Sequence, residues 1–419
     1  MPNIPIYATI PLMLGKLKAL RTNENILIAV DALLYSKSAF LSTFLMTYMI
    51  RLSLSNSSSG YIVYKLATYA VMIVLAAALI HFIKKYPLAA WRLGILFSIA
   101  QIAVIVLFHS YTDIFPYILA FVTGLESILY YRPYIFFCIT EVRNDRRLHF
   151  QSVKQVVNEV VKIVTPIIIG FLITDNGYLH TAIFILVICL VQLFLSILFR
   201  PSREISLPEH HVRTVLHQIA KHRSIRRLFL LQLFRGALIS GSAFLIVPTI
   251  LVYNQTGSDL DLGLYASVGA LIAIALILLF RQFARYKAFV RSFLVFMIPL
   301  VILVPLFLIL APSATAVVIL FIFSAAVFEG FFNVLLTTRI LSSLKKHLGE
   351  NAFTLEIESV GETFLCIGRV ISLAALLATI SISGTLYLPH FMLASAILIV
   401  PIIILVYSRR GDRLEPPTL

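Results

Sequence analysis

Charged residues are scarce in this sequence. Only 13% of its 419 residues are Asp, Glu, Lys or Arg, whereas 60% are hydrophobic. A soluble domain carries about 25% charged residues, so this chain has roughly half of the charge that a water-exposed surface needs. The shortage excludes a soluble globular protein and indicates that much of the surface faces lipid.

Cysteine is also scarce, with Cys138, Cys189 and Cys366 on separate apolar stretches. Their spacing fits neither a disulfide framework nor a metal site, and the ten histidines are scattered along the chain. A P-loop pattern for nucleotide phosphates does not occur either. We therefore expect no metal, no cofactor and no enzymatic activity, and no direct use of ATP.

Apolar runs of about 20 residues, long enough to cross a bilayer as a helix, recur along the chain. The sequence predicts an all-α, polytopic membrane protein with twelve transmembrane helices. Their expected ranges are 26–49, 61–82, 91–109, 115–140, 156–174, 179–199, 228–252, 262–280, 289–311, 315–338, 357–380 and 386–407.

The basic residues lie mainly on one side of these predicted helices, and the net charge is +15. Examples in the even-numbered connections are Lys84, Arg143 and Arg223, whereas Arg51 and Lys65 fall on the other side. Because basic loops stay on the cytoplasmic side during insertion, we expect a multi-pass plasma-membrane protein with both termini in the cytoplasm. Membrane topology therefore explains the positive charge, and we expect no nucleic acid partner.

One segment of the sequence occurs twice. "DALLYSKSAFL" (31–41) and "RGALISGSAFL" (235–245) share six of eleven positions, and Glu126 and Glu159 correspond to Glu329 and Glu362 at a similar offset. Parallel repeats of six helices, related by an axis along the membrane normal, are one known way to build a transporter. We predict two pseudo-symmetric six-helix bundles over 25–200 and 228–408, joined by a basic cytoplasmic linker at 201–227. Residues 1–24 and 409–419 are expected to be cytoplasmic.

The stretch "GLESILYYRPYIFFCITEVRNDRRLHFQSVKQVVNEVVKIVTPIIIGFLI" resembles the fourth helix, cytoplasmic loop and fifth helix of the major facilitator superfamily. Gly124, Pro133 and Glu141 fall where that family has a glycine, a proline and a terminal acid, and "TPIIIG" (Pro166, Gly170) is similar to its exporter motif. The loop "IKKYPLAAWRLG" keeps the family's basic residues but lacks its acid. The resemblance implies the fold of this superfamily and a transport function.

Ten ionisable residues fall well inside the predicted helices. A charge at the bilayer centre costs at least about 2.5–3.5 kcal/mol, so all ten are expected to face the protein interior and to compensate one another. The acids are Asp31, Glu126, Glu159, Glu329 and Glu362, and the bases are Lys37, Arg132, Lys162, Arg235 and Arg369.

Spacing along the helices suggests how these charges pair. Glu159 and Lys162 are three residues apart and can form a structural ion pair. Glu362 and Arg369 share a face but lie about 10 Å apart along the axis, so each is expected to need a partner from elsewhere, in a structural or a functional role.

Two further hypotheses concern equivalent positions in the repeats. The family's arrangement implies that Asp31 and Arg235 meet across the pseudo-symmetry axis, as a gate, as a site for a zwitterionic substrate or as a permanent bridge. Glu126 and Glu329 have no base within one turn on their own helices, and Lys37 or Arg132 can supply the counter-charge. A carboxyl group in a low-dielectric site resists ionisation, so Glu329, with Glu126 as second choice, is expected to carry a coupling proton.

The leading functional hypothesis is a monomeric secondary active transporter that works by alternating access, surrounded by membrane lipids, and we expect protons to be the coupling ion. The exporter-like motif favours efflux of a small, amphipathic molecule. A lipid or glycolipid flippase on the same fold, or a non-transporting membrane sensor, are the alternatives.

The predicted topology can be tested by labelling. Cysteines introduced at Ser57 and Ser258 should react with an impermeant thiol reagent added outside intact cells, because both lie in predicted outer loops. A cysteine at Arg223 should react only after the membrane is permeabilised. Labelling of position 223 alone in intact cells would invert the topology.

Overall fold

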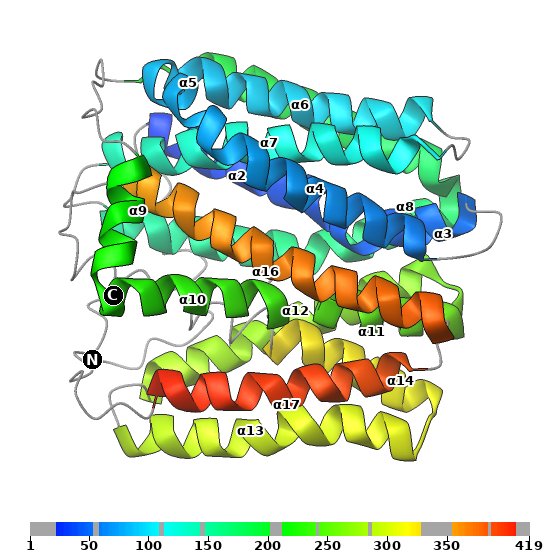
Figure 1. Ribbon diagram of the computed structural model, residues 1–419. Coiled ribbons are helices and arrows are strands. Elements are labelled where there is room, and N and C mark those ends of the chain that lie inside the picture. The colour runs from blue at the N-terminus through cyan, green and yellow to red at the C-terminus, as the bar shows by residue number, and fades with distance from the viewer. Residues whose placement is uncertain are drawn as a thin grey trace.

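The computed structural model describes residues 22–52, 58–108, 113–142, 147–201, 212–239, 243–283, 287–327, 354–383 and 387–407. Within these ranges every regular element is a helix, and the long helices lie side by side in one bundle (Figure 1). In chain order the helices are α2 (Thr22–Ala39), a π-helical turn η2 (Phe40–Phe44), α3 (Leu45–Leu52), α4 (Ser59–Ala78), α5 (Ile80–Lys85), α6 (Pro87–Leu107), α7 (Phe115–Thr140), α8 (Arg147–Leu198), α9 (Val212–Lys221), α10 (Arg223–Leu238), α11 (Ala243–Thr256), α12 (Asp259–Phe283), α13 (Lys287–Leu310), α14 (Ala314–Phe323), α16 (Thr354–Ser383) and α17 (Leu388–Tyr407).

Each of the twelve predicted spans overlaps at least one of these helices. Within the described residues, six helices are long and apolar enough by themselves to cross a membrane, and shorter apolar helices lie at Pro299–Leu310, Ala314–Val327 and Leu388–Ile399. The predicted spans 156–174 and 179–199 both lie in α8, where Gly177 has φ 81° and ψ 170°. A residue with a side chain is strained at such a φ, so glycine marks the point where the chain reverses between two spans. The polytopic all-α fold is thus confirmed.

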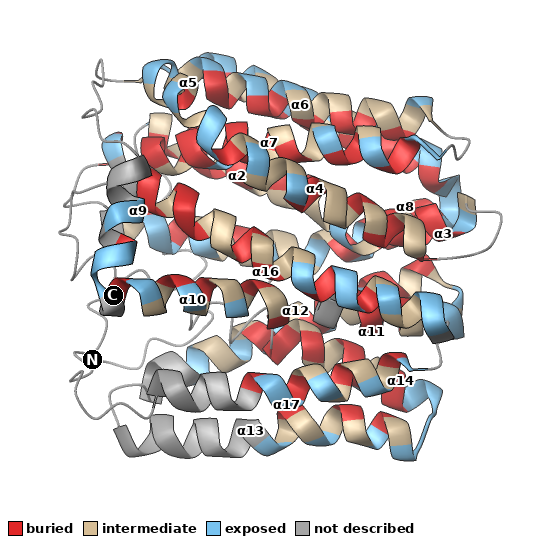
Figure 2. Cartoon of the chain, in the orientation of Figure 1, coloured by how far each residue is buried: buried red, intermediate tan, exposed pale blue. Residues whose placement is uncertain are grey.

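Exposed residues lie along the helices of the bundle (Figure 2), and many of them carry large apolar side chains. Examples are Val74 on α4, Leu107 on α6, Phe194 on α8 and Leu310 on α13. Monomeric soluble proteins rarely expose contiguous apolar surface on this scale, whereas a bilayer requires it. The bundle therefore buries its few polar groups inside and presents its apolar groups to lipid.

The first and second halves of the chain meet along two helix pairs, in which α12 packs against α8 and α16 packs against α4. Glycines allow the first of these contacts. A Cβ atom at Gly170 of α8 would lie 3.0 Å from the Asp259 carbonyl oxygen, and one at Gly263 of α12 would lie against the backbone of Pro166. The exporter-like motif with Pro166 and Gly170 is therefore part of the interface between the two halves.

Backbone contact is closer still between α10 and α16 in the second half. A Cβ atom at Gly368 would overlap the carbonyl oxygen of Leu233, and one at Gly236 would overlap that of Leu365. Gly361 lies on the same helix as Gly368, but a Cβ there would meet the Gln232 side chain only at an ordinary 3.7 Å.

These contacts predict different outcomes for two glycine substitutions in α16. Gly368→Ala should destabilise the protein by about 1–3 kcal/mol or more, because the added methyl group meets backbone that cannot move aside. Gly361→Ala should leave stability unchanged or slightly raised, because alanine favours the helix. The measurement is the unfolding temperature of each purified variant in the same detergent. Equal unfolding temperatures would contradict the close backbone contact at Gly368.

Candidate substrate and coupling site

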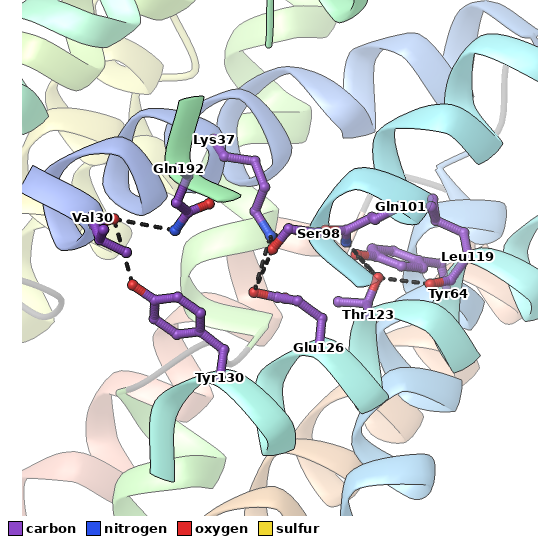
Figure 3. A network of polar contacts seen from close by, with 10 residues as sticks. All are labelled: Val30, Lys37, Tyr64, Ser98, Gln101, Leu119, Thr123, Glu126, Tyr130 and Gln192. Atoms are coloured by element: carbon purple, nitrogen blue, oxygen red, sulfur yellow. Dashed lines mark hydrogen bonds and ion pairs between the residues drawn. The ribbon is translucent and has the colours of Figure 1, made fainter. Parts of the chain in front are cut away.

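Among the ion pairs of the described residues, the pair with both partners most deeply buried lies inside the first half of the chain. Lys37 of α2 lies 3.1 Å from Glu126 of α7, and both side chains are almost inaccessible. The Lys37 ammonium group also donates hydrogen bonds to Ser98 Oγ at 3.1 Å and Gln101 Oε1 at 3.0 Å, both on α6. Ser98 in turn donates to Glu126 Oε1 at 3.2 Å (Figure 3). The counter-charge of Glu126 is therefore Lys37.

This network continues to a fourth helix. Gln101 donates to Thr123 Oγ1 at 2.5 Å, and Thr123 lies 3.2 Å from the Tyr64 hydroxyl of α4 while donating to the Leu119 carbonyl (Figure 3). Charges and amides that satisfy one another in this way fix the helices that carry them. The network joins α2, α4, α6 and α7, so its geometry is that of a structural core within the first half.

Asp31 is also buried, but its partners come from α8. The Lys154 ammonium group lies 3.4 Å from Asp31 Oδ2, and Asn158 donates a hydrogen bond of 2.7 Å to the same oxygen. Lys154 also lies 4.6 Å from the ring centre of Tyr134. The apolar pattern left Lys154 outside the predicted fifth span, whereas α8 begins at Arg147 and carries it into the helix.

The expected contact between Asp31 and Arg235 is not formed in this structure. Because α2 packs against α8, the Asp31 carboxylate meets Lys154 and Asn158 of that helix. The Arg235 guanidinium donates to Gln232 Oε1 on its own helix at 2.9 Å. Two equivalent residues in a repeat lie at the same position along their helices. Their side-chain partners still differ, because each helix packs against different neighbours.

Glu159 and Lys162 form the ion pair that their spacing predicts, at 3.0 Å within α8. Gln155 also donates a 2.5 Å hydrogen bond to Glu159 Oε1, and the Lys162 ammonium group lies 5.3 Å from the ring centre of Tyr35. The pair is more exposed than those of Lys37 and Asp31.

Glu362 and Arg369 contact each other directly, which corrects the expectation that seven residues separate them too far. Arg369 Nη1 donates to Glu362 Oε1 at 2.9 Å within α16. The expectation considered only the distance between the two positions along the helix axis. The long arginine and glutamate side chains span that distance of two turns. The Arg369 guanidinium also lies 4.9 Å from the ring centre of Tyr69 on α4, so the pair reaches the first half of the chain.

The charge of the same carboxylate also acts on two further arginines. Arg132 of α7 is buried and donates to the Ala76 carbonyl of α4 at 2.8 Å, and Arg235 of α10 donates to Gln232. The charge of Glu362 acts on the guanidinium groups of both. We call Glu362, Arg369, Arg132 and Arg235 the Glu362 cluster, which draws on α7 from the first half and on α10 and α16 from the second.

An ion pair that the sequence pattern did not reveal joins the two halves at one end of the bundle. Arg51 at the end of α3 lies 2.5 Å from Asp259 at the start of α12, and Asp259 also accepts a 2.8 Å hydrogen bond from Thr47. Arg51 Nε donates to the Tyr253 hydroxyl at 2.6 Å. We call this the Arg51 end. The sequence held one signal for this ion pair, because Arg51 is one of only two bases on the predicted outer side.

A second such pair lies at the opposite end, which we call the Lys84 end. Lys84 of α5 forms an ion pair with the buried Glu356 at the start of α16. The loop "IKKYPLAAWRLG" lacks the family's acid, and its Lys84 pairs instead with an acid from the other half of the chain.

Glu329, the preferred candidate for the coupling proton, lies outside the described residues, as do most residues of the predicted N-terminal segment and all of those of the C-terminal tail. Among the described residues, no group of three or more His, Cys, Asp or Glu side chains is placed to hold a metal ion.

The Lys37–Glu126 pair generates a stability prediction. Lys37→Met should destabilise the protein by about 3–5 kcal/mol, because it leaves a carboxylate buried without its counter-charge. The double change with Glu126→Gln should recover much of that loss, because both charges are then gone. Lys162→Met, at the more exposed pair, should cost no more than about 1 kcal/mol. Thermal unfolding of the four proteins measures these differences, and a double variant no more stable than Lys37→Met would argue against the pair.

Solved transporter structures share this arrangement of helices. A bacterial homologue of the iron transporter ferroportin in an inward-facing state matches with a TM-score of 0.67 and 14% identity, over 92% of this chain and 99% of that one. A variant of the nucleoside transporter NupG matches with a TM-score of 0.67 and 12% identity, over 92% of this chain and 100% of that one. A bacterial metal transporter matches with a TM-score of 0.59 and 15% identity, over 93% of this chain and 99% of that one.

Identities this low show the fold alone, and none of the curated proteins matches the sequence. The family model is more informative, because the model of the Major Facilitator Superfamily matches residues 139–356, just over half of the chain. This protein therefore belongs to the Major Facilitator Superfamily.

Proposed function

We propose that this protein is a secondary active transporter that moves a small molecule across the plasma membrane by alternating access. In this superfamily two parallel six-helix repeats rock about a site near the membrane midplane. The observation that carries the proposal is a charged cluster between two ion pairs that join the halves at opposite ends. The Glu362 cluster lies between the Arg51–Asp259 pair and the Lys84–Glu356 pair along the helices.

The two end pairs fit the requirements of alternating access. A transporter opens to one side at a time, so the contacts at one end must break while those at the other hold. Asp259 and Glu356 are both buried although their basic partners are more accessible. We assign residues 25–200 and 228–408 as the two moving bodies, with both termini in the cytoplasm and the Arg51 end outside.

We further propose that protons drive the transport and that the direction is export. Glu126 is less suited to carry the proton than the sequence suggested, because its carboxylate is held between Lys37 and Ser98. Glu329 remains our first candidate, since its helix corresponds to that of Glu126 in the other repeat. The exporter-like motif at Pro166 and Gly170, which lies against α12, supports the direction.

Flux in proteoliposomes tests this function. Vesicles with the purified protein are loaded with a defined mixture of carboxylates, sugar phosphates, nucleosides, amines and divalent metal ions, and mass spectrometry follows what leaves them. We expect at least one component to move uphill when a pH gradient is imposed, and to stop when a protonophore collapses the gradient. No movement beyond that of protein-free vesicles, with fluorescent phospholipids crossing instead, would favour a flippase.

The matched variant is Glu329→Gln, which keeps the shape of the side chain but cannot ionise. It should abolish uphill movement while sparing downhill exchange of the same component. Uphill transport with unchanged pH dependence would rule out Glu329 as the coupling group.

A further inference from the structure

The ion pairs of this protein differ in how easily their carboxylates are reached. Among the ion-paired carboxylates of the described residues, the Glu362 side chain is the most exposed, at 40%, whereas that of Glu159 is 16% exposed and the others are 6% or less. Breaking a deeply buried pair strands a charge and is costly, whereas an accessible pair contributes little. Glu362 is therefore the carboxylate that another anion displaces at least cost.

The partners of Glu362 suit an incoming anion. A guanidinium group is a planar fork that matches carboxylate and phosphate oxygens in a bidentate way and stays charged at any physiological pH. Arg369 holds Glu362 directly at 2.9 Å, and the Glu362 charge also acts on Arg132 and Arg235. One guanidinium group thus holds the replaceable carboxylate directly, and two more are subject to its charge, with Glu358 as a second carboxylate acting on Arg132.

The side chains of the cluster are also held in place without Glu362. Arg132 is anchored to the Ala76 carbonyl, Arg235 to Gln232, and Arg369 lies over the ring of Tyr69. Because these anchors do not involve the carboxylate, its departure leaves the arginines positioned. A site that is organised before its ligand arrives loses little free energy to ordering.

We propose that Arg132, Arg235 and Arg369 bind an anionic group of the transported molecule, a carboxylate or a phosphate, and that Glu362 occupies the site as an internal competitor until that molecule arrives. This inference rests on the proposed transport function and specifies its substrate class. The arginines come from both halves of the chain, so a bound anion contacts both moving bodies. A cationic solute meets repulsion from the same three groups.

Binding to the purified full-length protein tests the substrate class without a known substrate. The probes are benzoate, phenyl phosphate, benzamide and benzylamine, which share one ring and differ in charge. A ligand that binds the folded state raises the unfolding temperature, and the stabilisation grows with the logarithm of 1 + [L]/Kd. The fluorescence of Trp91 and the tyrosines reports unfolding. We expect benzoate or phenyl phosphate to raise that temperature, and benzamide and benzylamine to leave it unchanged.

The variants separate competition from a general charge effect. Arg235→Gln should weaken binding of the effective anion by about tenfold, the scale for one lost hydrogen bond to a charged group. Glu362→Gln should instead tighten it by at least a few-fold, which misfolding cannot mimic, and Glu362→Asp serves if the first variant is unstable. Lys85→Gln removes one positive charge from an exposed position and should change nothing.

The outcomes are decisive in both directions. Equal shifts with all four probes, no shift with either anion, or weaker anion binding in Glu362→Gln would overturn the proposal. Loss of the phenyl phosphate effect when phosphatidylglycerol, but not phosphatidylcholine, is added would support the anion site and assign it to a lipid headgroup. Flux of a neutral or cationic solute in the vesicle assay would leave the transport function standing while removing this substrate class.

Discussion

The cost of placing a charge in a low-dielectric interior governs this structure. A charge at the bilayer centre is so unfavourable that each one inside the bundle needs an opposite charge or a set of hydrogen bonds. Lys37 meets Glu126, Asp31 meets Lys154, and Glu362 meets Arg369. These contacts help to determine which helix faces are turned inward (Figure 2), and many large apolar side chains on the other faces are exposed.

The same interaction serves different purposes according to its burial. The Lys37–Glu126 pair is enclosed by hydrogen bonds from neighbouring helices and holds the first half together (Figure 3). Arg51–Asp259 and Lys84–Glu356 join the two halves at their ends, where a moving transporter must make and break contacts. The Glu362 carboxylate is the most exposed of these, and it pairs with Arg369. Ion pairs of the same chemical kind thus range from permanent contacts to contacts that can be exchanged.

Much of the fold follows from the sequence, but less of the site does. Apolar runs located all twelve helical regions, and the stretch from Gly124 to Ile173 indicated the family. Among the charges, the local pair Glu159–Lys162 was predicted from spacing alone, because both residues lie on one helix. In this structure Asp31 meets Lys154 and not the expected Arg235. Which partner Asp31 meets depends on the rotation of α2 about its own axis, and the repeat does not encode that rotation.

The sequence by itself determined the membrane-spanning class, the helical regions and the identity of the charges that must be compensated. These depend on composition and on periodicity along one helix, which are local properties of the chain. Only the tertiary structure decided which charges meet: Lys154 with Asp31, Asp259 with Arg51, Glu356 with Lys84, and the Glu362 carboxylate with Arg369. Except for the last pair, these partners lie on different helices, and their meeting depends on how glycine-lined faces such as those of α8 and α12 allow the backbones to approach.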